Sequence, residues 1–157
     1  MKIKLIVIGK TNTDWLIKGI QEYTKRLVHY TQFEIIEIPD QKNRANLSME
    51  KLKALEEIEI EKYLHPDHEW IALDEHGKEL TSEGFSKFIE KKLIDGKKQL
   101  TFIVGGAFGI SDKILDNCHV KIALSQMTFS HQMVRLLFVE QLYRSFTILK
   151  GEKYHHK

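Results

Sequence analysis

Short apolar segments alternate along the chain with longer segments whose apolar residues recur at helical spacing. The apolar segments are rich in Ile, Val and Leu, as buried strands are, and they cover 3–9, 33–38, 70–74, 100–104 and 120–124. The periodic segments predict helices over 13–27, 48–64, 81–95, 111–118 and 131–149. This alternation predicts an α/β fold with a mostly parallel sheet and helices on both faces, in a single domain covering residues 1–157.

Residues that favour helix ends and turns support these boundaries. Ser48, either Thr81 or Ser82, and Ser111 stand at the starts of predicted helices, and their side-chain oxygens can accept first-turn N–H groups. A turn is expected at 76–78, after the third strand. The helix over 131–149 carries an inward stripe formed by Val134, Leu137, Phe138, Leu142, Ser145 and Leu149.

Composition describes an ordinary globular protein of 157 residues, with 42% hydrophobic and 29% charged residues. Cys118 is the single cysteine, which excludes an internal disulfide and favours a reducing compartment. The apolar run near Leu5 is too short for a secretory signal, and no segment approaches the length of a membrane span. We therefore expect a cytoplasmic protein.

The net charge of +2 is small, but its distribution is uneven. Residues 1–100 hold 17 Lys and Arg against 18 Asp and Glu, whereas residues 101–157 hold 7 against 4, with four of the eight histidines. This mild basic bias suits an RNA phosphate partner. Chance clustering on a solvated surface is the alternative interpretation.

Candidate chemistry gathers where strands end, because open α/β sheets bind ligands beyond the carboxyl ends of their strands. Glycines follow one strand at Gly105 and Gly106, where a missing Cβ lets a ligand approach the backbone. The spacing fits neither a dinucleotide fingerprint nor a P-loop. His65 and His68 flank Pro66 and lack cysteine support, so no metal site is expected.

The combination of features in the last third is specific. A strand runs into a Gly-Gly-x-x-Gly turn, a loop precedes His131, a helix carries Arg135, and the chain ends with Tyr154 and His155. In this order and spacing the chain resembles the RlmH-type methyltransferases of the SPOUT superfamily over essentially its whole length. One departure is Ser130, which stands where that family usually has proline.

The resemblance implies a deep trefoil knot within about residues 100–157, whose loops bind S-adenosylmethionine. By motif match the cofactor lies against Leu73, Gly105, Gly106, Ser125, Gln126, Met127, Thr128, Phe129 and Ser130. It also implies the activity, which is methylation of N3 of a pseudouridine in large-subunit ribosomal RNA.

Catalysis would require groups that align the base and help the N3 proton leave. The candidates are His155, Tyr154, Arg135 and Arg144, with His131 as a further proton acceptor. Each has a structural alternative: Arg144 can pair with Glu140, His131 can cap its helix, and the Tyr-His-His-Lys end can be a frayed tail.

Arg135 and Arg144 are nine positions apart and hence about 180° apart on one helix. They cannot converge on one site unless a second subunit supplies one of them, so we expect a homodimer. Further expectations are ribosomal RNA as partner, within the assembled ribosome, and neither membrane nor metal. The alternatives are a non-catalytic ribosome-binding factor with the same fold and, less favoured, a flavodoxin-like nucleotide-binding protein.

Overall fold

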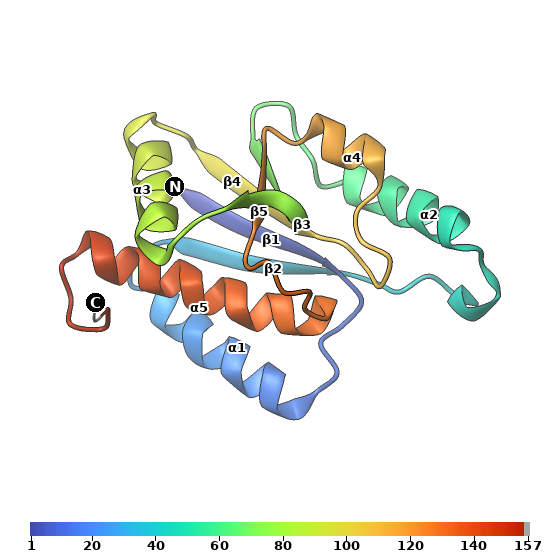
Figure 1. Cartoon of the computed structure of the whole chain (residues 1–157), viewed down its shortest axis with the longest axis horizontal. Helices are drawn as coiled ribbons and strands as arrows, with labels where there is room; N and C mark the ends of the chain where they lie inside the picture. Colours follow the sequence, from blue (N-terminus) through green and yellow to red (C-terminus); the bar gives the residue numbers. More distant parts are fainter. Residues whose placement is uncertain (156–157) are drawn as a thin grey trace.

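A single parallel sheet forms the centre of the computed structural model, which describes residues 1–155 (Figure 1). Its strand order is β2-β1-β4-β3-β5. Each pairing between neighbouring strands is parallel. The strands are β1 (Lys2–Ile8), β2 (Gln32–Ile38), β3 (Glu69–Glu79), β4 (Gln99–Val104) and β5 (Val120–Ala123). The predicted α/β class and mostly parallel sheet are confirmed.

Helices cover both faces of the sheet. One face packs against α1 (Asp14–Leu27), α3 (Ser82–Ile94) and α5 (His131–Leu149). The other packs against α2 (Met49–Glu61) and α4 (Asp112–Asn117). A short 3₁₀ turn, Arg44–Asn46, precedes α2.

Two hydrophobic cores result from the alternation of side chains along each strand. In β1, Ile3, Leu5 and Val7 enter the core beneath α1, α3 and α5. Ile6 and Ile8 of the same strand enter the core beneath α2 and α4. Burial on both faces explains why the central strands β1 and β4 are mostly apolar in the sequence.

Side-chain caps fix the helix starts. Ser48, Thr81 and Ser111 each accept a first-turn N–H, as predicted. Ser130 caps α5, because its hydroxyl accepts the N–H of Met133 at 3.3 Å. The cap is therefore Ser130 and not His131. A serine here supplies an acceptor that proline lacks.

The prediction of a turn at residues 76–78 is wrong. These residues continue β3, which pairs with β5 on both sides of an irregularity, so that Ile122 lies opposite both Leu73 and Lys78. A Cβ at Gly77 would lie 2.6 Å from the Ile122 backbone nitrogen. Gly77 thus allows two backbones to approach closely, and local turn propensity gives way to sheet pairing.

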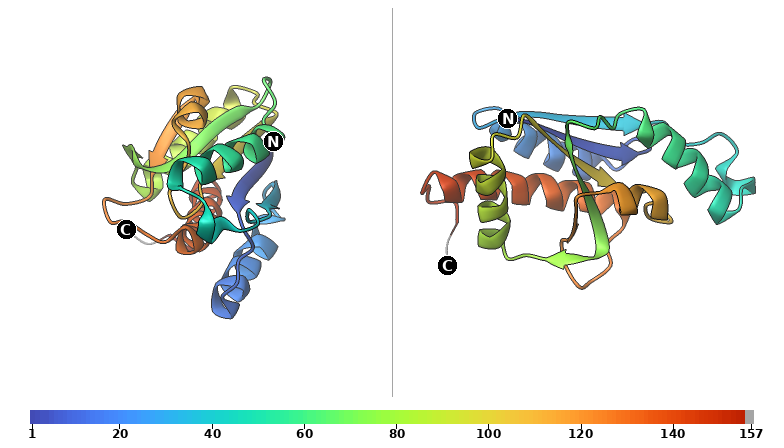
Figure 2. Two further views of the ribbon diagram at one scale, coloured as in Figure 1. Left: turned by 90° about the vertical axis from the view of Figure 1, so that its right-hand side faces the viewer. Right: turned by 90° about the horizontal axis from the view of Figure 1, so that it is seen from above.

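Helix α5 runs along the length of the molecule (Figure 2). With a rise of about 1.5 Å per residue, its ends are roughly 28 Å apart. His131 begins it at the carboxyl ends of the strands, and the chain terminus leaves its other end, beside α3. The trefoil knot that the resemblance implies stays a prediction.

Candidate functional site

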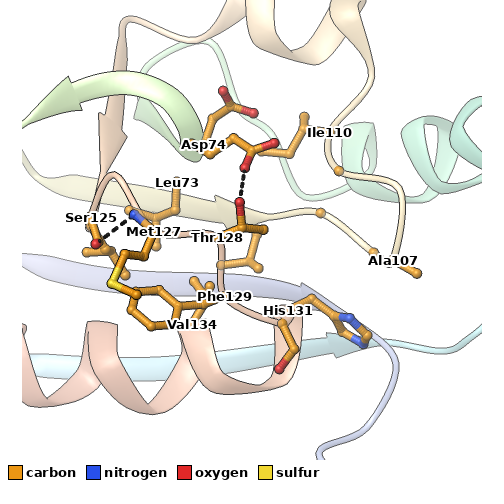
Figure 3. Close-up of a pocket in the computed structure, with 17 residues that line it drawn as sticks. Leu73, Asp74, Ala107, Ile110, Ser125, Met127, Thr128, Phe129, His131 and Val134 are labelled. Atoms are coloured by element: carbon orange, nitrogen blue, oxygen red, sulfur yellow. Dashed lines mark hydrogen bonds between the residues drawn. The ribbon is translucent and has the colours of Figure 1, made fainter.

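A cavity of about 460 Å³ lies beyond the carboxyl ends of β4 and β5, beside the irregularity in the middle of β3 (Figure 3). The carboxyl edge is where α/β sheets bind ligands. The cavity walls come from the middle of β3, the turn after β4, the loop after β5 and the first turn of α5. The lining residues are Leu73, Asp74, Glu75, Val104, Gly105, Gly106, Ala107, Gly109, Ile110, Leu124, Ser125, Met127, Thr128, Phe129, Ser130, His131 and Val134.

The cofactor residues implied by the resemblance gather here with one exception. Leu73, both glycines and the loop residues line the cavity, but Gln126 does not. Asp74, Glu75 and Ile110 also line it without having been assigned a role. Asp74 and Glu75 lie at the end of the strand predicted over 70–74, which was the available sequence signal, although β3 itself continues to Glu79. Ile110 carried no such signal.

The glycine turn after β4 packs closely against other atoms of the chain. A Cβ at Gly105 would lie 2.3 Å from the carbonyl carbon of Gly109, and one at Gly106 would lie 2.6 Å from a carboxylate oxygen of Glu56. The N–H of Gly109 donates to the Gly106 carbonyl at 3.1 Å. A side chain at Gly106 would therefore meet Glu56 behind the turn. Gly106 also lines the cavity, so the expected close approach of a ligand stays a prediction.

Hydrogen bonds shape the loop between β5 and α5. The hydroxyl of Ser125 accepts the N–H of Met127 at 3.0 Å, and the hydroxyl of Thr128 donates to Glu75 at 2.9 Å (Figure 3). The second bond ties the loop to the middle of β3. Met127 is 73% exposed, so this methionine is a surface residue and not part of a core.

His131 is the one proton-acceptor candidate that lines the cavity. Burial, followed by the cations Arg135 and Arg44, lowers the pKa of its imidazole, while Asp40 opposes them. A lowered pKa keeps the ring neutral near pH 7, which is the form that can accept a proton.

Arg135 is directed away from the cavity and is almost fully buried at 1% exposure. Its guanidinium donates to the carbonyls of Ile8 and Gly9, at 2.5 and 3.0 Å, and to the hydroxyl of Thr11 at 3.0 Å. It therefore fixes the segment that connects β1 to α1.

Arg144 and Tyr154 form a cluster at the other end of α5. Arg144 pairs with Glu140 at 2.6 Å, and its guanidinium lies 4.7 Å from the centre of the Tyr154 ring. The Tyr154 hydroxyl donates to the same carboxylate at 3.0 Å and lies 3.2 Å from the Tyr23 hydroxyl. Burial and these bonds raise the pKa of Tyr154, so its phenol stays protonated.

His155 lies beside α3, with its Nε2 atom 3.7 Å from Glu83. Its Nδ1 atom is buried and has no hydrogen-bond partner within the described chain. Within the chain, the cavity and the residues Tyr154 and His155 thus lie at opposite ends of α5. Arg135 and Arg144 do not converge, as their spacing predicted.

Within residues 1–155, no cluster of three or more His, Cys, Asp or Glu side chains is arranged to hold a metal ion. No helix in this part of the chain is long and apolar enough to cross a membrane.

Comparison with known proteins gives consistent matches. The family model described as predicted SPOUT methyltransferase matches residues 1–155. The chain is 50% identical to ribosomal RNA large subunit methyltransferase H of Parabacteroides distasonis over 157 residues, which is all of both chains. It is 51% identical to the protein of that name from Cytophaga hutchinsonii over 156 residues, covering 99% of this chain and 100% of the relative.

Solved structures share the fold at low sequence identity. A probable methyltransferase from Bordetella pertussis Tohama I superposes with a TM-score of 0.58 at 11% identity, over 92% of this chain and 96% of that one. A probable methylase family protein from Haemophilus influenzae Rd KW20 superposes with a TM-score of 0.53 at 12% identity, over 99% of this chain and 70% of that one.

Proposed function

Because this chain belongs to the SPOUT methyltransferase family, we propose that it methylates N3 of a pseudouridine in large-subunit ribosomal RNA, with S-adenosylmethionine as methyl donor. The observation that carries the proposal is the cavity at the strand ends, lined by the turn and loop that the family resemblance assigns to the cofactor. The full-length relatives named for large-subunit RNA methylation support the choice of substrate.

The cavity has the size and chemistry that the cofactor needs. About 460 Å³ lies within the roughly 300–1,000 Å³ typical of small-molecule sites. Leu73, Ile110 and Val134 offer apolar contact for an adenine ring, and Asp74 and Glu75 offer carboxylates for cationic groups. When bound, the cofactor supplies a methyl group activated on a sulfonium.

The chain's own task is to position the base and remove the N3 proton. His131 lies at the cavity in its neutral form and is suited to accept that proton, directly or through water. Arg144, Tyr154 and His155 offer a cation, a phenol and an imidazole for holding RNA and the target base. Arg135 acts at a distance, by fixing the β1–α1 segment.

A homodimer would join the two parts of this site. The tail of one subunit lies at the far end of α5 from its own cavity. A second copy packed antiparallel along α5 would bring its Tyr154 and His155 to the first subunit's cavity. Light scattering should then give twice the chain mass of 18.4 kDa at micromolar concentration; a stable monomer would contradict this arrangement.

Two measurements test the activity. Calorimetric titration should show S-adenosylmethionine binding to the purified protein. Mass spectrometry should show that ribosomal RNA from a deletion strain lacks one methyl group, and that the purified protein restores it on isolated ribosomes. Cofactor binding without methylation of any RNA would favour a different substrate. Ribosome binding without cofactor binding would favour a non-catalytic factor, and flavin binding would favour the flavodoxin-like alternative.

A further inference from the structure

A glutamate interrupts the apolar stripe of α2. Leu52, Glu56 and Ile60 follow one another at four-residue spacing and are the three buried residues of this helix. Glu56 is only 6% exposed. The stripe therefore places a carboxyl group at a position where packing alone favours an apolar side chain.

Other acidic residues of α2 form ion pairs with lysines. Glu57 and Glu61 both pair with Lys113, and Glu59 pairs with Lys62. Glu56 forms no ion pair with any residue in 1–155. A buried carboxyl group without a cation costs free energy, so its presence requires a separate explanation.

The partner of Glu56 is the backbone of the glycine turn. The N–H of Gly106 donates a hydrogen bond to its carboxylate. The two carboxylate oxygens lie 2.6 and 2.8 Å from where a Gly106 Cβ would stand. Because Gly106 also lines the cavity, one short stretch of backbone touches the cavity on one side and Glu56 on the other.

The charges around Glu56 affect its protonation. Burial raises the pKa of Glu56, and the negative charge of Asp40 raises it further. The Gly106 hydrogen bond, Arg44 and Lys53 oppose this rise. The Gly106 bond thus favours the ionised form, since a carboxylate is the stronger acceptor.

We propose that Glu56 is a positioning residue of the cofactor site, holding the turn from Gly105 to Gly109 from behind through the Gly106 N–H. Glu56 contacts the backbone of Gly106, and it touches neither cofactor nor RNA. The inference rests on the proposed function, because it assigns the cavity to S-adenosylmethionine. The contact agrees with glycine at 106, where a Cβ would lie 2.6 Å from a carboxylate oxygen of Glu56.

Nuclear magnetic resonance tests the contact without any ligand. In the wild-type protein, the amide signal of Gly106 should shift with pH, with a midpoint above the ordinary glutamate value of 4.5. In Glu56→Gln this titration should disappear, because the amide oxygen accepts the bond but does not ionise. A wild-type Gly106 amide that does not titrate in this way would overturn the proposal.

Calorimetry and kinetics test the consequence. Glu56→Leu continues the apolar stripe and removes the acceptor, so the protein should fold while binding S-adenosylmethionine at least about tenfold more weakly. The KM for the cofactor should rise with little change in kcat, and Glu56→Gln should restore most of the affinity. Glu59→Leu, at a partly exposed position of α2 whose carboxylate pairs with Lys62, is the matched control and should bind normally.

The outcomes separate the two proposals. Wild-type affinity in a folded Glu56→Leu variant would remove Glu56 from the site and leave the proposed function intact. A wild-type protein that binds no S-adenosylmethionine would refute the proposed function instead. If Glu56→Leu fails to fold, the pH titration of the Gly106 amide and the S-adenosylmethionine affinity of Glu56→Gln test the proposal instead. A tenfold loss of affinity in Glu56→Gln would count against the role of Glu56 as a hydrogen-bond acceptor.

Discussion

The hydroxyl of Tyr154 donates a 3.0 Å hydrogen bond to Glu140, the carboxylate that also pairs with Arg144. The Tyr154 ring lies 4.9 Å from that of Tyr143 in an edge-to-face arrangement. These contacts attach the end of the chain to α5, so the alternative of a frayed tail is wrong for Tyr154. His156 and Lys157, the rest of that predicted tail, lie outside the described residues.

Removing the tail should abolish methyl transfer and spare cofactor binding. A variant that ends at Lys153 should lose at least roughly 100-fold in turnover on ribosomes, the low end of a general acid–base contribution. Its affinity for S-adenosylmethionine should change little, because the cavity is formed by residues up to Val134. His155→Ala should reproduce much of the loss, whereas Lys153→Ala is the control. Normal turnover by the truncated protein would assign catalysis to the cavity alone.

Replacing Arg135 should destabilise the fold more than replacing Arg144. Arg135→Met leaves the carbonyls of Ile8 and Gly9 buried without a donor, which should cost about 3 kcal/mol. Arg144→Met breaks a partly exposed pair with Glu140, which should cost about 1 kcal/mol or less. Urea unfolding of both variants measures the difference. Equal losses would contradict the anchoring role of Arg135.

Gly106→Ala should destabilise the protein because its methyl group would meet Glu56. A Cβ 2.6 Å from a carboxylate oxygen requires either that side chain or the turn to move. Shortening the neighbour in the double variant Gly106→Ala, Glu56→Ala should therefore cost less than the sum of the single changes. Thermal unfolding and cofactor titration of the set give the coupling, and strict additivity would place the two side chains out of contact.

Acid should weaken the fold through His131. Its pKa is lowered in the folded protein, chiefly by burial and then by Arg135 and Arg44. The folded state thus binds fewer protons than the unfolded chain, so the contribution of His131 is complete above about pH 6.5 and is lost as pH falls through the folded pKa. Urea unfolding between pH 5 and 8 should show a shallower acid loss for His131→Gln than for wild type, and an equal acid loss in the two proteins would contradict this role.

Much of the fold was predictable because its signals are local. Apolar runs bounded by polar residues located each strand, and the side chains of Ser48, Thr81 and Ser111 marked helix starts that the structure reproduces. These features depend on neighbours a few residues away. The length of β3, in contrast, depends on a distant segment, because its second half forms only where β5 approaches Gly77.

The position of the site was predictable from the sequence, but the contacts that hold it together were not. The glycine turn and the loop before His131 suffice to indicate a cavity at the strand ends. The partner of Arg135, 124 to 127 residues away, and the contact between Glu56 and Gly106 depend on how distant segments pack. A glutamate within an apolar stripe was the one sequence sign of the second contact.

In the proposed dimer, the separation of cavity and tail along α5 makes activity a shared property of two copies of the chain. In the proposed dimer, a protein with a damaged cavity still offers a sound tail, and a protein without its tail still offers a sound cavity. Mixing two such inactive variants should therefore restore turnover, because each mixed pair contains one complete site. Serial dilution of the wild-type protein should lower activity per subunit as pairs dissociate.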